Sequence, residues 1–271
     1  MDFASKLMER TGKGYLSYSA IKYAADGADE QDMKLFELYM RGLLKKESDA
    51  LTFGSLYDTL LLEPETLNDK FFILNDEDKV EELKSKYKTP RSTKEYKEWL
   101  EEQTKESGSR RIVSSELITQ AEDMIIRLDD SHILNHQTGE LVPVRYFITG
   151  EVQKEILSWI NDIPIRGFLD VRGDGFITDS KTTRSISGFR YDVFKRCYDI
   201  QAYIYTQSEG IDQFYWAVQT TSKPYTVAIY KATPQTLARG EEKFWSAVNN
   251  IAKWLDDPSR DSSSFAIYSE I

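Results

Sequence analysis

The chain has 271 residues, of which 40% are hydrophobic and 30% charged, so it is long enough to bury a core without disulfides or a structural metal. Its single cysteine, Cys197, excludes an internal disulfide and a zinc site built from cysteines, and suits a reducing cytoplasm. The net charge of -10 excludes a protein that coats DNA nonspecifically, but not an enzyme whose basic residues line one groove. We expect no membrane span, because no apolar run approaches ~18–20 residues, and no signal peptide.

Residues 1–65 are predicted to form a helical N-terminal part. Ser17 or Ser19 is a candidate N-cap for a helix that opens at SAIKYAA, and a second helix is expected in QDMKLFELYMRGLL. A third, LTFGSLYDTLLLEPE, ends where Pro64 blocks its continuation. Residues 76–111 follow as a charged helical insertion, since 20 of these 36 residues are charged and their signs alternate.

Beyond a further helix at about 114–129, the hydrophobic period changes to that of strands. Between 143 and 181 the runs VRYFIT, QKEILSWI, IPIRGFLDV and GFITDSKT predict strands, with hairpin turns at residues 161–162 and 173–175. A helix at about 190–207, the strands FYWAVQTT and YTVAIYKA, and a last helix in TPQTLARGEEKFWSAVNNIAKWL complete the chain. This order predicts an α/β fold with a central mixed β-sheet flanked by helices, within 143–257 of a single domain over 1–271.

The strongest chemical signal is a pair of aspartates on two adjacent strands. Asp170 closes GFLD, and Asp179 begins DSK after a glycine turn, so the turn brings both carboxylates to one point. Lys181 lies two residues beyond Asp179 and projects from the same strand face. Two hard carboxylates favour Mg²⁺ or Mn²⁺, and the lysine can orient a water or stabilise developing charge. A polar hairpin end with a surface ion pair would give the same D-x-K tripeptide.

The stretches GFITDSKTT and IRGFLDV resemble the PD-(D/E)xK nuclease superfamily, and more narrowly its RecE-like branch of exonuclease VIII and phage exonucleases. LSYSAIKYAA is similar to the opening segment of that branch, LTFGSLYDTLLLEPE to its G-x-x-x-H helix, and TSKPYTVAIY to its late strand pair. The resemblance runs from Leu16 to about Trp254. It implies a restriction-endonuclease-like core that carries a catalytic set of Asp170, Asp179 and Lys181.

The resemblance also implies further site residues. Asp58 stands where the branch carries histidine, and it is either an additional metal ligand or a helix residue paired with a basic side chain. Gln201 and Tyr205 match a Q-x-x-x-Y motif beside the metal site, although the same spacing suits a buried helix face. Glu151 or Glu155 could add a carboxylate, and the sequence does not say which of the two faces the site.

From this resemblance we expect a Mg²⁺-dependent exonuclease, with Mn²⁺ able to substitute, that digests double-stranded DNA from 5′ ends. The 3′ single strands it leaves would serve a RecT-like annealing partner in a bacterial or phage-infected cell. The expected ligands are Asp58, Asp170, Asp179 and the carbonyl of Ser180. The candidate phosphate contacts are Thr182, Thr183, Arg184, Arg190, Lys195 and Arg196, and the alternative is that they are solvated surface residues. The alternatives are a single-strand or structure-specific nuclease of the same superfamily, and an inactive DNA-binding module on the nuclease fold.

The branch also implies a homo-oligomer, a ring of three or four subunits around DNA. A ring could turn basic residues inward and the acidic surface outward, which suits the net charge of -10. The candidate subunit contacts are Trp245, Trp254, Phe265, Ile267 and Tyr268, and the alternative is that these residues pack within one chain.

Overall fold

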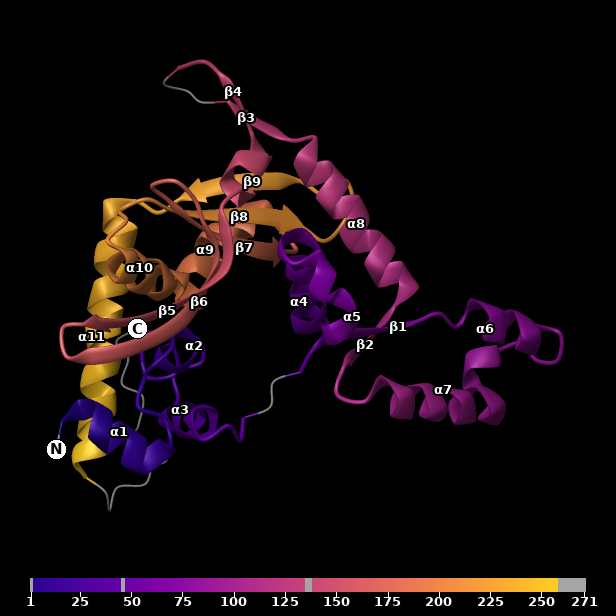
Figure 1. Ribbon diagram of the computed structural model, residues 1–271, viewed down its shortest axis with the longest axis horizontal. Helices are drawn as coiled ribbons and strands as arrows, with labels where there is room; N and C mark the ends of the chain where they lie inside the picture. The colour runs from indigo at the N-terminus through magenta and orange to yellow at the C-terminus, as the bar shows by residue number, and fades with distance from the viewer. Residues whose placement is uncertain (1, 45–46, 135–137, 258–271) are drawn as a thin grey trace. The chain divides into compact units, whose positions relative to one another are not determined.

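The computed structural model describes residues 2–44, 47–134 and 138–257, which form two compact units (Figure 1). One unit is the continuous segment Glu47–Asp129, and the chain on both sides of this segment forms the other, here called the sheet unit. The predicted helical part, residues 1–65, is therefore shared between the two units. No helix in the described residues is long and apolar enough to cross a membrane.

The sheet unit is built on a five-stranded sheet in the order β5-β6-β7-β8-β9. Its strands are β5 Glu151–Ile160, β6 Ile163–Arg172, β7 Ile177–Thr183, β8 Phe214–Thr220 and β9 Val227–Lys231. Neighbouring strands are antiparallel except for β7 and β8, which are parallel. A parallel pair needs a crossover, which the helices α9 Ile186–Lys195 and α10 Tyr198–Glu209 provide. The predicted mixed sheet flanked by helices is confirmed, and so are both hairpin turns.

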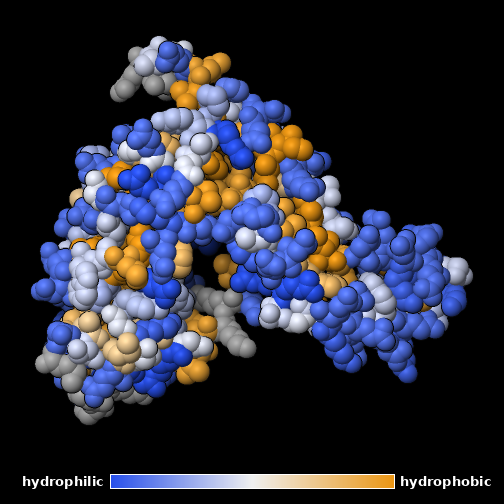
Figure 2. Space-filling view, in the orientation of Figure 1, coloured by the Kyte–Doolittle hydropathy of each residue, from blue (hydrophilic) through white to orange (hydrophobic). Residues whose placement is uncertain are grey.

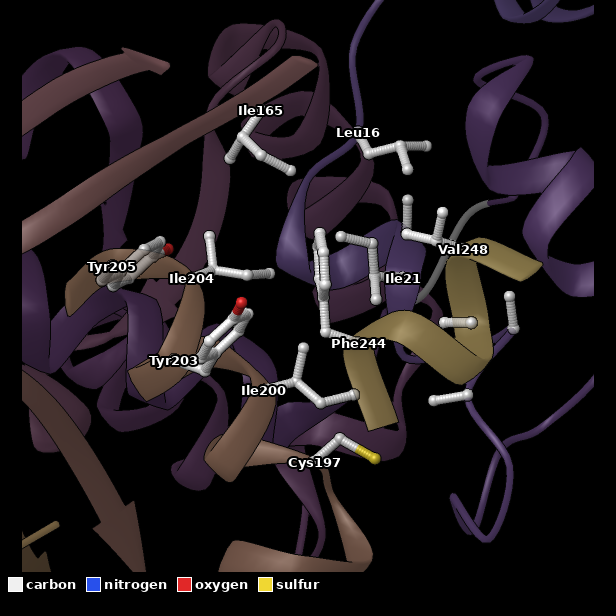
Figure 3. Packing of buried hydrophobic residues seen from close by; sticks show 14 of the residues in the cluster. Leu16, Ile21, Ile165, Cys197, Ile200, Tyr203, Ile204, Tyr205, Phe244 and Val248 are labelled. Carbon is white, nitrogen blue, oxygen red and sulfur yellow. The ribbon is translucent and has the colours of Figure 1, made fainter. Parts of the chain in front are cut away.

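The core of the sheet unit lies between the sheet, α10 and the long helix α11 Pro234–Asp256 (Figure 3). Three N-terminal helices complete it: α1 Phe3–Thr11, α2 Tyr18–Ile21 and α3 Met33–Met40. Ser17 is the N-cap of α2, because its side chain accepts the N–H of Ala20. The segment before α2 joins the sheet, where Leu16 forms an isolated bridge with Ile165 of β6.

Two predicted elements take a different form. Residues 144–148, expected as a strand, form the 3₁₀-helix η3, whose buried residues Val144, Phe147 and Ile148 have helical rather than alternating spacing. The helix expected over 190–207 is two helices, because Cys197 adopts a left-handed conformation (φ 59°) between α9 and α10. A short hairpin, β3 His132–Leu134 with β4 Leu141–Pro143, precedes η3.

The unit Glu47–Asp129 is mainly helical. Its helices are α4 Asp49–Leu62, η1 Pro64–Thr66, α5 Leu67–Lys70, α6 Glu77–Lys84, η2 Pro90–Ser92, α7 Lys94–Ser107 and α8 Ser115–Asp129. The short strands β1 Phe71–Leu74 and β2 Arg111–Ser114 pair in parallel. In the sequence, β1 precedes α6 and β2 follows α7. The visible surface of α6 and α7 is almost entirely hydrophilic, as their alternating charges led us to expect (Figure 2).

The tryptophans of α11 pack within the chain. Trp254 is fully buried, with the Arg10 guanidinium 3.8 Å from its ring centroid and an edge contact to Phe36. Trp245 packs edge-on against Phe244. A subunit contact through Trp254 is therefore wrong, because this side chain is already used to hold α1 and α3 against α11. Phe265, Ile267 and Tyr268 lie outside the described residues.

Candidate active site

Asp170 lies where strands β6 and β7 part. The two strands pair only through Val171 with Thr178 and Arg172 with Ile177. Immediately before Val171, Asp170 Oδ2 accepts the backbone N–H of Ser180 at 2.8 Å. A side-chain oxygen thus accepts the hydrogen bond that a backbone carbonyl would accept in a continuous sheet. Farther back along β6, the backbone bonds instead to Leu16. The divergence leaves the Asp170 carboxylate fixed beside β7.

Asp179 is held by one partner on each carboxylate oxygen. Its Oδ1 accepts the amide Nε2 of Gln201 at 2.7 Å, and its Oδ2 forms an ion pair with the ammonium of Lys181. The residue is only 3% exposed, because α10 packs over this part of β7. A buried carboxylate is costly unless its charge is paired, and here the Lys181 ammonium pairs the charge while Gln201 satisfies Oδ1.

Lys181 remains a full cation in this setting. Burial alone lowers the pKa of its ammonium, but the charges of Asp179 and Asp170 outweigh burial and hold that pKa above its ordinary value. Its Nζ lies 5.0 Å from the ring centroid of Tyr198, which adds a cation–π contact. The alternative that the sequence left open was a surface ion pair at a polar hairpin end. It is wrong for Asp179, which is buried beneath the crossover helix.

Tyr205 of the Q-x-x-x-Y motif and Gly167 of GFLD are in direct contact. A Cβ at Gly167 would lie 3.0 Å from a ring carbon of Tyr205, so the glycine leaves room for the tyrosine. Burial raises the pKa of the Tyr205 hydroxyl, and the charges of Asp179 and Asp170 raise it further, so this group remains protonated. The structure thus brings Asp170, Asp179, Lys181, Gln201 and Tyr205 to one site.

The donor set fits a divalent metal ion with oxygen ligands. Asp170 and Asp179 supply carboxylates on facing strands, and the carbonyl of Ser180 lies between Asp179 and Lys181 in the chain. The described residues contain no group of three or more His, Cys, Asp or Glu that could hold a metal. Two carboxylates with water are a normal set for Mg²⁺, which keeps several of its waters in proteins.

The residue of β5 that faces Asp170 is Gln153, which the sequence did not single out. Gln153 has a positive φ of 48° and lies opposite Asp170, between the paired residues Val152 and Lys154, in the register that the rest of the hairpin keeps. Its Nε2 lies 3.4 Å from Asp170 Oδ1. The structure does not bring the two candidate glutamates into a cluster with the aspartates: Glu155 pairs with Arg166 at 2.7 Å, and the largely exposed Glu151 lies 3.8 Å from Lys154.

The chain matches the family described as "PDDEXK-like domain of unknown function (DUF3799)" over residues 17–260. This range holds the unit Glu47–Asp129, most of the sheet unit and every candidate site residue. The chain belongs to this PDDEXK-like family. The predicted PD-(D/E)xK superfamily is confirmed, whereas the RecE-like branch remains a prediction.

A solved structure supports the PDDEXK-like fold. A crystal structure of a protein described as a "Putative exonuclease" from Eubacterium rectale superposes with a TM-score of 0.60. The two chains are 16% identical, and the match covers 94% of this chain and 85% of the other. The crystal structure of SSO0001, with a TM-score of 0.25, 15% identity and coverage of 70% and 84%, is too dissimilar to inform the fold. No curated protein matches the chain.

The predicted phosphate contacts of this PDDEXK-like domain follow the site along the chain. Thr182 and Thr183 are half-buried at the end of β7, and Arg184, Arg190 and Lys195 are exposed beyond it. Arg196 is exposed and lies 3.4 Å from Asp192. Asp58 is a half-buried residue of α4, in the unit Glu47–Asp129. Its role as a ligand stays a prediction.

Proposed function

We propose that this PDDEXK-like protein is a metal-dependent deoxyribonuclease that hydrolyses phosphodiester bonds of double-stranded DNA from an end. The observation that carries the proposal is the arrangement of Asp170, Asp179 and Lys181 around the point where β6 and β7 part. Clustered carboxylates repel a phosphate unless a cation lies between them. A binding-only module would have no use for them, which disfavours the inactive alternative.

Each residue would have a distinct task. Asp170, Asp179 and the Ser180 carbonyl would hold Mg²⁺ or Mn²⁺, and a bound divalent ion supplies Lewis-acid stabilisation of charge on the phosphoryl oxygens. Lys181, a permanent cation, would orient the attacking water. It would also stabilise the negative charge that develops on the phosphoryl group during the attack. Gln201 would fix the carboxylate plane of Asp179 through its 2.7 Å hydrogen bond.

The finer parts of the proposal come from the RecE-like resemblance. They are digestion from 5′ to 3′, a RecT-like annealing partner, a ring-shaped homo-oligomer, and Asp58 as an additional ligand. The rival within the enzyme class is a single-strand or structure-specific nuclease. Duplexes labelled at the 5′ or the 3′ end distinguish these readings, because a 5′ to 3′ exonuclease releases the 5′ label first and a structure-specific nuclease needs no free end.

The deciding experiment is digestion of linear duplex with Mg²⁺ or Mn²⁺, compared with EDTA and with a closed circle. We expect the linear duplex alone to be degraded, and Asp179→Asn or Lys181→Gln to lower the rate by about 100-fold or more. Asp174→Asn is the matched control, since Asp174 is exposed in the turn between β6 and β7.

Melting curves must accompany the rates, because loss of one partner from a buried ion pair can cost about 3–5 kcal/mol. Asp170→Asn provides a second test at a residue that is less buried than Asp179. Near-normal digestion by folded Asp170→Asn and Asp179→Asn would overturn the assignment of the site.

A further inference from the structure

A cleft opens in the sheet unit next to the candidate active site. Its volume is about 380 Å³, within the range of small-molecule sites. We call it the aromatic cleft, and its main lining residues are Lys13, Tyr15, Tyr39, Arg166, Phe168 and Tyr205. Gly167 and Tyr205 form the wall that the cleft shares with the active site. Gly167 lies only three residues before Asp170 in the chain. A DNA strand that leaves Asp170 on this side would therefore enter the cleft.

The rings of the cleft are accessible and fixed. Phe168 is 49% exposed, and Tyr15 and Tyr39 are half-buried. The Arg166 guanidinium lies 5.1 Å from the ring centroid of Tyr15 and 5.9 Å from that of Phe168. It also donates hydrogen bonds to Glu155 and to the Tyr15 hydroxyl, at 2.7 and 2.8 Å. These contacts hold the side chains in place before any ligand arrives, which lowers the entropy cost of binding.

Lys13 provides an available positive charge at the cleft. It forms no ion pair within residues 2–44, 47–134 and 138–257, and its ammonium lies 5.5 Å from the ring centroid of Tyr39. The net charge of the chain is -10, so a lysine without an acidic partner is a local exception. Beside several accessible aromatic rings, it favours an anion that carries a planar ring.

We propose that the aromatic cleft binds unpaired nucleotides of the DNA strand adjoining the cleavage site, with bases stacked on its rings and a phosphate on Lys13. Stacking aromatics beside basic side chains are the combination that grips single strands without reading their sequence. The bases of a duplex are stacked on one another and present no free faces. The inference rests on the proposed nuclease function and makes it more specific: the strand is separated from its complement beside the active site.

Binding without cleavage tests the inference directly. Fluorescence anisotropy of a labelled ten-residue oligothymidylate is measured in EDTA, next to a strand of the same length and charge that lacks bases. We expect the strand with bases to bind at least about fivefold more tightly. Phe168→Ala should remove most of this preference. The matched control is Tyr87→Ala, because Tyr87 is a 41% exposed aromatic outside the cleft lining.

Lys13 is tested through the salt dependence of binding. Lys13→Ala should lower the slope of log K against log salt by about 0.7, the value for one phosphate contact on a single strand. The control, Lys253→Ala, removes an exposed lysine from α11 and should leave the slope unchanged. If wild-type protein binds neither strand, or if Phe168→Ala and Lys13→Ala bind as their controls do, the inference is overturned.

The same proteins separate this inference from the proposed function. Wild-type protein that degrades duplex with Mg²⁺ while the cleft variants bind like their controls would keep the nuclease and remove the cleft. Wild-type protein that prefers the strand with bases, through Phe168 and Lys13, yet never cleaves with any divalent metal would keep the cleft and remove the nuclease.

Discussion

At the scale of single residues, the site holds the charge of Asp179 buried and paired. Lys181 already occupies one oxygen of Asp179, and Gln201 occupies the other. A metal ion that binds Asp179 must therefore share the carboxylate with an ammonium. Since both cations compete for the same oxygen, the orientation of the carboxylate decides how well the metal is held. Gln201 sets this orientation, so it is the residue whose loss should act on metal affinity first.

Gln201→Leu should raise the Mg²⁺ concentration needed for half-maximal digestion by about tenfold, because Asp179 Oδ1 loses its fixed donor. Gln207→Leu is the control, since Gln207 is exposed on the same helix. A Mg²⁺ titration that is identical for the two variants would show that Gln201 does not orient the ligand. In the same titration, Asp58→Asn should shift the midpoint only if Asp58 is a ligand.

At the scale of elements, the site depends on how α10 is held over β7. Gly240 of α11 approaches α10 so closely that a Cβ there would lie 2.1 Å from the carbonyl oxygen of Asp199. Next to this contact, Lys243 pairs with the fully buried Asp199 at 3.0 Å and donates to the carbonyl oxygen of Phe194 at 2.7 Å. Burial raises the pKa of the Asp199 carboxyl, and Lys243 opposes that shift. Together these contacts join α9, α10 and α11.

Gly240→Ala should lower the free energy of unfolding by about 1–3 kcal/mol, because the two helices must move apart to admit the methyl group. Gly188→Ala in α9 is the matched control. A Cβ there meets only Ser185, at 3.5 Å, so this variant should be stabilised by about 0.5–1 kcal/mol through the gain in helix propensity. Chemical denaturation measures both effects, and equal midpoints for the two variants would contradict the close helix contact.

The elements also show which features the sequence could reveal. Asp170, Asp179 and Lys181 could be found from the sequence, because a hairpin brings the residues on its two strands close together whatever the exact register. Gln153 was missed because its contact with Asp170 depends on the exact register of β5 against β6, which the turn at residues 161–162 sets. The 3₁₀-helix η3 and the break at Cys197 arise from tertiary packing, which overrides the local period. The burial of Asp179 required knowledge of where the crossover helix lies.

At the scale of the whole molecule, the proposed homo-oligomer needs a surface through which its subunits meet. The edge strand β5 pairs with β6 alone within the described residues, and its outer face exposes Leu157 (71%) and Trp159 (66%). Long apolar edge strands are places where chains associate. A second copy of this chain is the expected occupant, because association would cover these residues and allow basic side chains of several subunits to surround one DNA.

Light scattering at tens of micromolar protein should therefore give three or four times the chain mass of 31.4 kDa. Leu157→Glu should lower this mass, because a charge in a covered apolar face must be desolvated. Leu141→Glu places the same charge at a leucine that is 67% exposed on β4, and should leave the mass unchanged. A wild-type monomer that still digests long duplexes processively would rule out the ring. If both variants assemble like the wild type, β5 is not the subunit contact, and the subunits must meet through another face.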